Sequence, residues 1–341
     1  MQAALWYGPE DVKVEEVNIP EIGPDEVLVK VGVALTCGTD FKLFRTGHAV
    51  LVKNLPSPFG HELAGTVAEI GSKVKNFQVG DRVVAANSAP CGNCFFCHRG
   101  QLNLCENLEF LNGAYAEYIR IPARIVEKNL HKIPEGVPFR EAALTEPLAC
   151  ALQCIERISP RSGETLCIIG AGPCGLLFVQ LGKLYGANVT VLGRGEEKLA
   201  VARRLGADHI FSVNYEGFLE KVKGSTPENH GADIVVEAAG RPETWELATR
   251  LVRKGGRVWF YGGCAKGTQV TLDTHRLHYD EISLAGIFHH TPAHFARSLS
   301  LIATKKIDVS PLIAGERRLA DLNQVFQKGV SENPLKIAII P

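Results

Sequence analysis

The stretch Thr165-Leu-Cys-Ile-Ile-Gly-Ala-Gly-Pro-Cys-Gly175 decides the fold of the second half of this chain. It begins as a short apolar strand, passes through a glycine-rich turn and runs into a helical segment over Leu176–Tyr185. A Gly-x-Gly-x-x-Gly pattern is a weak signal alone, but between a strand and a helix it is typical of a dinucleotide-binding turn. The alternative is a glycine-rich turn with a structural role only.

The residues of this turn that we expect to bind the cofactor are Gly170, Gly172, Pro173 and Gly175. The first glycine makes the tight turn, the second lets the backbone approach a pyrophosphate, and the third lets helix and strand pack closely. The phosphates would then lie at the N-terminus of the helix, where unpaired N–H groups and the helix dipole favour an anion.

The end of the second strand bears on the choice of cofactor. A carboxylate usually lies there and binds the ribose 2′-hydroxyl of NAD, but Gly193 and Arg194 follow the predicted strand Asn188–Leu192. Without the carboxylate a repulsive charge is lost and space opens for a 2′-phosphate, which a guanidinium suits well. The sequence therefore favours NADP over NAD. In the alternative, Arg194 is solvated or stacks on the adenine.

Strands and helices alternate through the rest of this half. Further strands are expected over 232–237, 257–261 and 282–288, with helices over 196–205 and 244–252. Such alternation indicates a doubly wound parallel sheet of the Rossmann type. We place this dinucleotide-binding domain at residues 149–289, and the fold class is α/β.

The first part of the chain has a different pattern. Short apolar runs over 26–33, 63–70 and 81–86 are separated by prolines and glycines, which predicts a mostly antiparallel β domain. The apolar tail Lys336–Ile340 is expected to return to this domain as a strand. We therefore assign residues 1–148 and 290–341 to one domain, with a helix after residue 290.

Four of the ten cysteines crowd into one short segment: Cys91, Cys94, Cys97 and Cys105. Four thiolates in such a loop can close a tetrahedral site, and a zinc site with no open position is structural. An iron–sulfur cluster also uses four thiolates, and it remains the alternative together with a loop that binds no metal.

Three dispersed segments supply a second set of ligand types. Cys37, His61 and Glu146 provide a thiolate, an imidazole and a carboxylate. Three protein ligands with a fourth position left open are typical of a catalytic zinc site. Taken singly, none of these residues indicates a metal site, since a lone cysteine or histidine is more often a buried core residue.

Composition excludes several classes of protein. The 341 residues include 37 basic and 37 acidic side chains, so the net charge is zero, and 45% of the residues are hydrophobic. Nucleic-acid and membrane-surface proteins usually carry a basic excess, and no stretch approaches the ~20 apolar residues that span a bilayer. We expect a cytoplasmic protein with a small-molecule substrate.

With these motifs in one order, the chain resembles the zinc-containing medium-chain dehydrogenase/reductase superfamily, in the branch of sorbitol, threonine and glucose dehydrogenases. The resemblance runs from end to end. It rests on Cys37-Gly-Thr-Asp40, Gly60-His-Glu62, Gly80-Asp-Arg-Val83, the Cys91–Cys105 segment, Gly113-Ala-Tyr-Ala-Glu-Tyr118, Glu146-Pro-Leu-Ala149 and the Gly170–Gly175 turn. It implies a GroES-like, mostly β catalytic domain, a Rossmann domain and two zinc ions per chain.

The resemblance also implies roles for single residues. Cys37 and His61 would bind the catalytic zinc, and Glu146 matches the third ligand of the polyol-dehydrogenase branch, with Cys150 as a weaker rival. Glu62 would be a carboxylate close to the metal that can swing onto it. Asp40, which lies in the same motif as Cys37, would orient His61.

The proton path is less clear than the metal ligands. Thr39 matches the hydroxyl that takes the proton of the substrate. In many relatives a histidine five residues after the first cysteine ligand passes the proton on, but Lys42 stands there in this chain. His48 lies nearby in the sequence. The exit route of the proton is therefore left open.

The predicted activity is hydride transfer between a secondary alcohol or polyol, or the matching ketone, and a nicotinamide cofactor. Alternatives are a quinone or enone reductase on the same fold, an NADPH-binding protein without activity, and a zinc-ribbon nucleic-acid binder. Candidate pocket residues are Phe44, Arg45, Phe59, Phe110, Glu117, His289 and His290, of which the phenylalanines at 59 and 110 are more typical of packing. The histidines at 289 and 290 could equally be exposed. The resemblance favours a homo-oligomer, a tetramer over a dimer, with strand 282–288 as an edge for pairing.

Overall fold

A computed structural model of the chain describes residues 1–47, 52, 54–213, 217–332 and 334–341, so His48 lies outside the described residues. The chain divides into two units. The first comprises Met1–Ala149, His290–Lys305 and Leu312–Pro341, and the second comprises Cys150–His289 and Lys306–Pro311.

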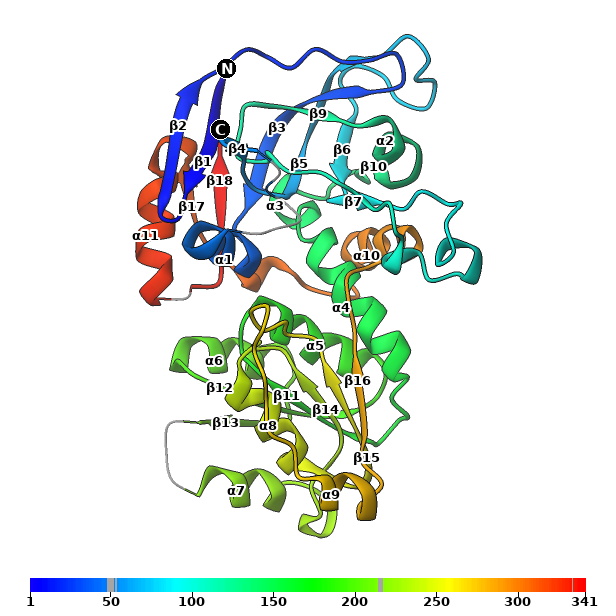
Figure 1. Ribbon diagram of the computed structural model, residues 1–341, viewed down its shortest axis with the longest axis vertical. Coiled ribbons are helices and arrows are strands. Elements are labelled where there is room, and N and C mark those ends of the chain that lie inside the picture. Colours follow the sequence, from blue (N-terminus) through cyan, green and yellow to red (C-terminus); the bar gives the residue numbers. More distant parts are fainter. Residues whose placement is uncertain (48–51, 53, 214–216, 333) are drawn as a thin grey trace. The chain divides into compact units, whose positions relative to one another are not determined.

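The second unit is built on a parallel sheet with the strand order β13-β12-β11-β14-β15-β16 (Figure 1). Because parallel crossovers are right-handed, the connections that run outward from β11 and from β14 place their helices on opposite faces. The predicted doubly wound sheet is thereby confirmed. The strands are β11 (Thr165–Ile169), β12 (Asn188–Gly193), β13 (His209–Ser212), β14 (Ala232–Glu237), β15 (Val252–Phe260) and β16 (Ser283–Gly286), and the helices α5 (Pro173–Leu184), α6 (Glu196–Arg204), α7 (Phe218–Gly224), α8 (Pro242–Leu251) and α9 (Thr274–Tyr279).

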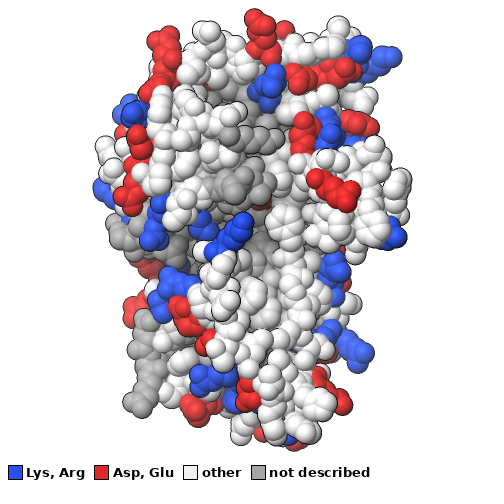
Figure 2. All heavy atoms as spheres, in the orientation of Figure 1, with Lys and Arg blue, Asp and Glu red and all other residues white. Residues whose placement is uncertain are grey.

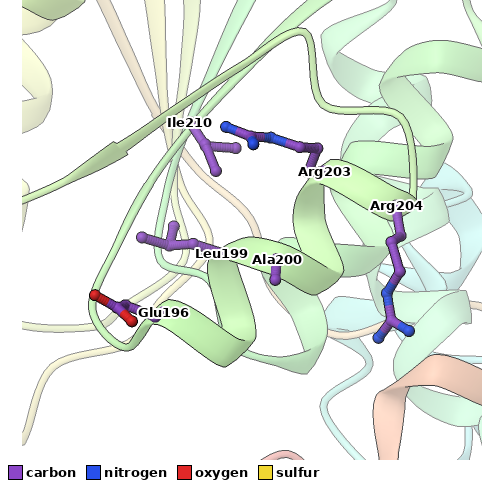
Figure 3. A pocket seen from close by; sticks show the side chains of 6 residues that line it. All are labelled: Glu196, Leu199, Ala200, Arg203, Arg204 and Ile210. Atoms are coloured by element: carbon purple, nitrogen blue, oxygen red, sulfur yellow. The ribbon is translucent and has the colours of Figure 1, made fainter.

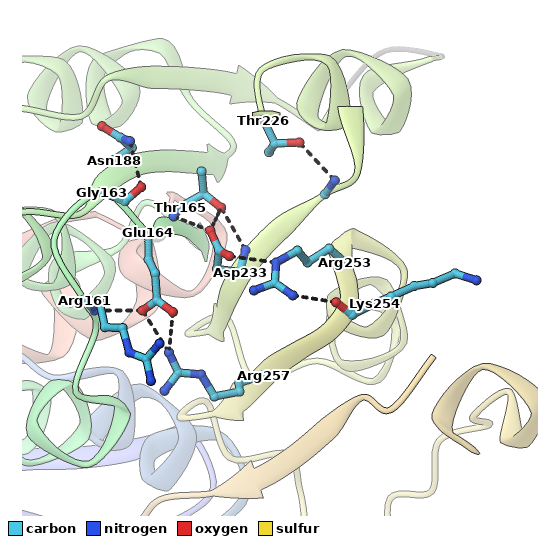
Figure 4. A network of polar contacts seen from close by, with 11 residues as sticks. Arg161, Gly163, Glu164, Thr165, Asn188, Thr226, Asp233, Arg253, Lys254 and Arg257 are labelled. Atoms are coloured by element: carbon cyan, nitrogen blue, oxygen red, sulfur yellow. Dashed lines mark hydrogen bonds and ion pairs between the residues drawn. The ribbon is translucent and has the colours of Figure 1, made fainter. Parts of the chain in front are cut away.

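A polar network joins the amino ends of these strands (Figure 4). The Asp233 carboxylate accepts hydrogen bonds from the backbone N–H and the hydroxyl of Thr165 at 2.7 and 2.6 Å, and from Arg253 Nε at 2.7 Å. Glu164 binds Arg257 in the same region. Burial works to raise the pKa of Asp233, but the bonds from Thr165 and Arg253 outweigh it and leave that pKa below its ordinary value.

The first unit contains a sheet in the order β10-β6-β5-β3-β18-β17, with β9 also paired to β3. The terminal strand β18 pairs antiparallel with β3 through Ala338 and Leu35, which confirms that the apolar tail returns to this sheet. The strands are β3 (Val27–Leu35), β5 (Glu62–Ile70), β6 (Arg82–Ala85), β9 (Tyr118–Ile121), β10 (Leu130–Lys132), β17 (Ile313–Arg318) and β18 (Lys336–Ile340).

Two smaller sheets and several helices complete this unit. The strands β2, β1 and β4 form one sheet, and β7 pairs with β8. The strands are β1 (Gln2–Gly8), β2 (Asp11–Glu16), β4 (Ser57–Pro58), β7 (Ser88–Ala89) and β8 (Glu109–Phe110), and the helices α1 (Gly38–Thr46), α2 (Ala123–Asn129), α3 (Phe139–Ala142), α10 (Pro292–Ala303) and α11 (Leu322–Glu332), while α4 (Thr145–Ile158) begins in this unit and continues into the second.

Aromatic rings fill the core beside α1 and α11. The Phe326 ring lies 4.8 Å from that of Phe59 and 5.5 Å from that of Phe44, centroid to centroid. Both partners are fully buried. Phe44 and Phe59, which the sequence offered as pocket candidates, are therefore packing residues, and together they fix α1 against the last helix.

The described surface agrees with the balanced charge. On the face shown in Figure 2, acidic and basic side chains are interspersed. Among the described residues, no helix has both the length and the apolar character needed to cross a membrane.

Candidate functional site

Three side chains of ligand type converge in the first unit. The ligand atoms of Cys37, His61 and Glu62 all lie within 4.8 Å of one another. Cys37 precedes α1, while His61 and Glu62 lead into β5. Gly60 has a φ of +88°, and a Cβ there would lie 2.5 Å from the Tyr115 ring. Only glycine fits this turn, which delivers His61 to the site.

Asp40 ties this group together from one buried position. Its Oδ1 lies 2.9 Å from His61 Nδ1, and its Oδ2 accepts from Tyr115 Oη at 2.7 Å and from the Cys37 N–H at 3.1 Å. Burial works to lower the pKa of His61, but the negative charges of Asp40 and Cys37 outweigh it and leave that pKa well above its ordinary value. Because Nδ1 faces the Asp40 carboxylate, the other ring nitrogen is left for a metal.

Glu62 is paired with a lysine from the far end of the chain. Lys336 Nζ donates to both Glu62 carboxylate oxygens at 2.6 Å and to the Thr36 carbonyl at 3.0 Å. Both charged side chains are buried. Burial raises the pKa of Glu62 to about 7, with Lys336 acting to lower it and Glu146 to raise it. Glu62 therefore lies within the group of Cys37, His61 and Glu62 while both of its oxygens accept hydrogen bonds from Lys336.

Glu146 lies in the first turn of α4 and contacts a different set of side chains. Asn87 Nδ2 donates to Glu146 Oε1 at 2.8 Å, and His290 Nε2 lies 4.0 Å from the same oxygen. Glu146 and His290 form a group of metal-ligand type separate from that of Cys37, His61 and Glu62. The negative charge of Glu146 acts to raise the pKa of Glu62, as expected for two carboxylates of one unit that lie near each other. Cys150 follows Glu146 by one turn on α4.

Thr39, the predicted proton acceptor, lies on the same helix as Lys42, which stands where many relatives have a histidine. Thr39 is the second residue of α1 and is half-buried, and the exposed Lys42 is three residues further on. Residues three apart share one face of a helix. Lys42 therefore lies on the Thr39 side of α1.

The four clustered cysteines form a compact lobe, which comprises residues 91–105. The ligand atoms of Cys91, Cys94, Cys97 and Cys105 lie within 4.8 Å of one another. The Sγ atoms of Cys94 and Cys105 are 3.8 Å apart, and those of Cys91 and Cys97 are 4.0 Å apart. A tetrahedron with Zn–S bonds of ~2.3 Å separates its sulfurs by about 3.8 Å, whereas a disulfide requires ~2.05 Å. The lobe therefore fits a zinc ion bound by four thiolates.

The glycine turn in the second unit has the shape of a phosphate cradle. Gly170 has a φ of +118°, and a Cβ at Gly175 would lie 1.8 Å from the Gly170 carbonyl oxygen. A Cβ at Gly172 would meet nothing within 4 Å, so the space over this residue is open. Pro173 begins α5. The turn follows β11, beside the point where the strand order reverses, which is where such sheets bind dinucleotides.

The structure gives Gly193 a packing role that the sequence did not indicate. A Cβ at this position would lie 2.5 Å from the Ala171 Cβ and 3.3 Å from Leu199 Cδ2. A side chain at residue 193 therefore collides with the second residue of the glycine turn. Arg194 follows as an exposed side chain. Packing against Ala171 accounts for the glycine at position 193. Of these two residues, Arg194 is therefore the one that bears on the choice of cofactor.

A surface pocket lies on the helix that follows this strand (Figure 3). Its lining contains none of the predicted site residues, and the Arg203 side chain extends toward Ile210 while Arg204 extends away from it. We assign no role in the chemistry to this pocket. The lining residues are Glu196, Leu199, Ala200, Arg203, Arg204 and Ile210.

Comparison with known families and proteins agrees with this geometry. Residues 23–135 match the alcohol dehydrogenase GroES-like domain, and residues 173–304 match the zinc-binding dehydrogenase domain. The chain is 31% identical to the sorbitol dehydrogenase of Bacillus subtilis (strain 168) over 352 residues, covering all of this chain and 97% of that protein. It belongs to the zinc-containing medium-chain alcohol dehydrogenase family.

Two further similarities support the same family. The chain is 33% identical to D-arabinitol dehydrogenase 1 of Uromyces fabae over 350 residues, covering all of this chain and 97% of that protein. A crystal structure from Sinorhizobium meliloti 1021, described as a zinc-binding dehydrogenase bound to NADP, is 32% identical. It superposes with a TM-score of 0.91, covering all of this chain and 99% of that one.

Membership of the family confirms the enzyme class predicted from the sequence. The protein is a zinc-dependent, NAD(P)-linked alcohol or polyol dehydrogenase with a GroES-like part and a Rossmann-type sheet.

Sequence reasoning missed two residues at the site of this dehydrogenase. Lys336 opens the otherwise apolar strand β18 and pairs with Glu62. A lone lysine in a strand predicted to be buried was a usable signal. Asn87 joins Glu146 to His290, but nothing in its sequence context distinguishes it from a loop asparagine.

Proposed function

We propose that this enzyme transfers a hydride between a secondary alcohol or polyol, or the matching ketone, and a nicotinamide cofactor, with NADP preferred over NAD. The convergence of the half-buried Cys37 with the buried His61 and neighbouring buried carboxylates carries the proposal. A zinc ion held there would supply a Lewis acid that lowers the pKa of the substrate alcohol. The cofactor carries the hydride.

The residues of the chain hold the reactants and move the proton. Cys37, His61 and Glu146 are proposed as the protein ligands, because both oxygens of Glu62 are engaged by Lys336. Asp40 fixes the His61 ring, and Thr39 takes the hydroxyl proton of the substrate. Glu62 is the carboxylate that can replace a ligand when Lys336 releases it.

Two variants test the choice of ligand. Glu146→Ala should lower zinc retention at the open site, while Cys150→Ser should leave it unchanged. Zinc retained after dialysis against a chelator is the measurement, and the lobe zinc serves as an internal standard. If the Cys150 variant loses the metal and the Glu146 variant keeps it, the assignment is reversed.

A substrate screen tests the proposed activity. Purified enzyme is assayed with secondary alcohols, polyols, aldoses and threonine, and with quinones and enones as the alternative class, using each cofactor in turn. Turnover of a secondary alcohol or polyol that stops on removal of the open-site zinc supports the proposal. Turnover of quinones or enones alone, unaffected by chelation, contradicts it.

Arg194 is the main support for NADP. A guanidinium binds a phosphate with charge-assisted hydrogen bonds of about 1.5–3 kcal/mol each, so even one is worth about tenfold or more in affinity. Arg194→Ala should lower kcat/KM with NADP about tenfold and leave NAD nearly unchanged. An equal loss with both cofactors would mean that Arg194 does not contact the 2′-phosphate.

The converse design must respect the packing of Ala171. We expect Gly193→Asp alone to impair binding of both cofactors, because the new side chain meets the Ala171 methyl group at 2.5 Å. Combining Ala171→Gly, Gly193→Asp and Arg194→Ala should turn the preference to NAD. The single Ala171→Gly variant is the matched control.

We also propose two zinc ions per chain, a cytoplasmic location and a homo-oligomer, a tetramer over a dimer. None of the ten cysteines, all of which lie among the described residues, forms a disulfide, as expected in a reducing compartment. The strand β16 is an edge of its sheet in the described chain and offers unpaired backbone groups to a second copy. Sedimentation that gives a monomer at working concentration would refute the oligomer.

A further inference from the structure

The Glu146 carboxylate is held by an amide that is held in turn by a histidine. Asn87 Nδ2 lies 2.8 Å from Glu146 Oε1, and Asn87 Oδ1 lies 3.1 Å from His290 Nε2. All three residues are buried, with exposed fractions of 6% for Glu146, 9% for Asn87 and 2% for His290. They come from three distant segments: the loop between β6 and β7, the start of α4, and the residues before α10.

The chemistry of the amide fixes every orientation in this chain of contacts. An ionised carboxylate only accepts hydrogen bonds, so the NH₂ group of Asn87 must face Glu146. The carbonyl oxygen of Asn87 then faces His290, which must donate from Nε2. If the amide turned over, its oxygen would face the Glu146 carboxylate and its NH₂ group would face the Nε2–H of His290, and neither contact is a hydrogen bond. His290 therefore helps to prevent the Asn87 side chain from turning over.

We propose that Asn87 and His290 are positioning residues that orient Glu146 toward the open-site metal. The Asn87 N–H occupies Oε1, which directs the metal to the other oxygen, Oε2, and His290 acts by locking the amide. This inference rests on the proposed role of Glu146 as a ligand. Partners that orient a ligand in this way typically change metal affinity by about 10–100-fold when they are removed.

The structure supplies a matched control for His290. The His290 and His131 rings both pack against Phe295, with centroids 5.7 and 5.6 Å apart from that ring. His131 lies on β10 and is not part of the contacts that join Asn87 to Glu146. Replacing either histidine by phenylalanine keeps a ring against Phe295, but only one replacement removes the donor to Asn87.

The experiment measures zinc retention and the visible spectrum of the enzyme with cobalt at the open site. Asn87→Ala and the isosteric Asn87→Asp should weaken zinc retention about 10–100-fold and shift the cobalt absorption, while the lobe zinc stays bound. His290→Phe should act in the same direction, His290→Gln should restore most of the loss by donating from its amide, and His131→Phe should resemble the wild type.

A double variant separates this inference from the ligand assignment. If Asn87 acts through Glu146, Asn87→Ala should add little to the loss caused by Glu146→Ala. Zinc lost in the Glu146 variant but kept in the Asn87 variants overturns the positioning role and leaves the ligand role intact. Zinc kept in the Glu146 variant overturns the ligand role. Equal losses in the His131 and His290 variants mean that packing on Phe295 is responsible, and the inference fails.

Discussion

The lobe offers four sulfur atoms and the open site offers sulfur, nitrogen and oxygen, and the two sites are built in opposite ways. The lobe takes its four thiolates from residues 91–105, and their sulfur atoms all lie within 4.8 Å of one another. The open site takes its proposed ligands Cys37, His61 and Glu146 from three segments, with Asp40 as a buried support of His61 and Lys336 as a buried partner of the neighbouring Glu62.

The two sites are therefore held by different forces. The lobe has little apolar core of its own, because its cysteines pack with each other and with a few partly buried residues, and Phe95 within it is 53% exposed. A bound metal would therefore supply much of its stability. In the open site Asp40 orients Cys37 and His61 in advance, and Lys336 holds the neighbouring Glu62. We therefore expect loss of lobe ligands to affect folding, and loss of open-site ligands to affect chemistry.

The largest effect is expected in the lobe. Cys94→Ser should release the lobe zinc and lower the melting temperature strongly, because structural zinc sites in small peptides are worth about 10–16 kcal/mol. Zinc analysis and thermal unfolding measure the change. A variant that keeps both zinc ions and the wild-type melting temperature would show that the lobe is held without the metal.

A ligand of the open site should affect activity far more than stability. Cys37→Ser should weaken binding of the open-site metal, which would stabilise developing charge by several kcal/mol. Because ~1.4 kcal/mol is a factor of ten, kcat/KM should fall by roughly a thousandfold. The melting temperature should change little. If unfolding of this variant resembles that of Cys94→Ser, the contrast between the sites is wrong.

The supports of the open site should give an intermediate effect. Asp40→Asn removes the charge beside His61 Nδ1 and should weaken zinc binding at this site about 10–100-fold, with the lobe zinc retained. Competition with a chelator gives the affinity, and Tyr115→Phe, which removes one donor to Asp40, tests whether a smaller loss follows. Unchanged affinity in Asp40→Asn would mean that the ring is fixed by packing alone.

A carboxylate that stabilises the fold without a metal should give the smallest effect. The pKa of Asp233 is lowered in the folded protein, so its contribution is present above the unfolded value of ~3.9 and is lost as the pH falls through the folded pKa. Asp233→Asn should therefore cost roughly 1–2 kcal/mol at pH 7 and progressively less toward pH 3.5.

Urea unfolding followed through Trp245 and Trp259, in a Trp6→Phe background, reports on this second unit. A loss that does not change with pH would show that the Asp233 contribution is not electrostatic.

The secondary structure that the sequence predicted depends on patterns of residues within short segments. The strand-turn-helix segment at 165–184 and the cysteine spacing at 91–105 each contain their own physical reason, since the glycines, the apolar runs and the thiols lie within one short segment. The strand β13 and the helix α11 were not predicted. β13 spans only His209–Ser212, in which Ile210 and Phe211 are the two apolar residues. α11 follows a polar stretch.

The sequence by itself determined the family, the doubly wound sheet, the lobe and the ligand types, because these depend on residue order over short distances. Only the tertiary structure decided which side chains support the ligands. Lys336 meets Glu62 across 274 residues, His290 meets Asn87 across 203, and Ala171 excludes a side chain at Gly193. Such contacts arise where strands and loops from distant segments pack, and no local pattern encodes the partner of a buried charge or the space beside a glycine.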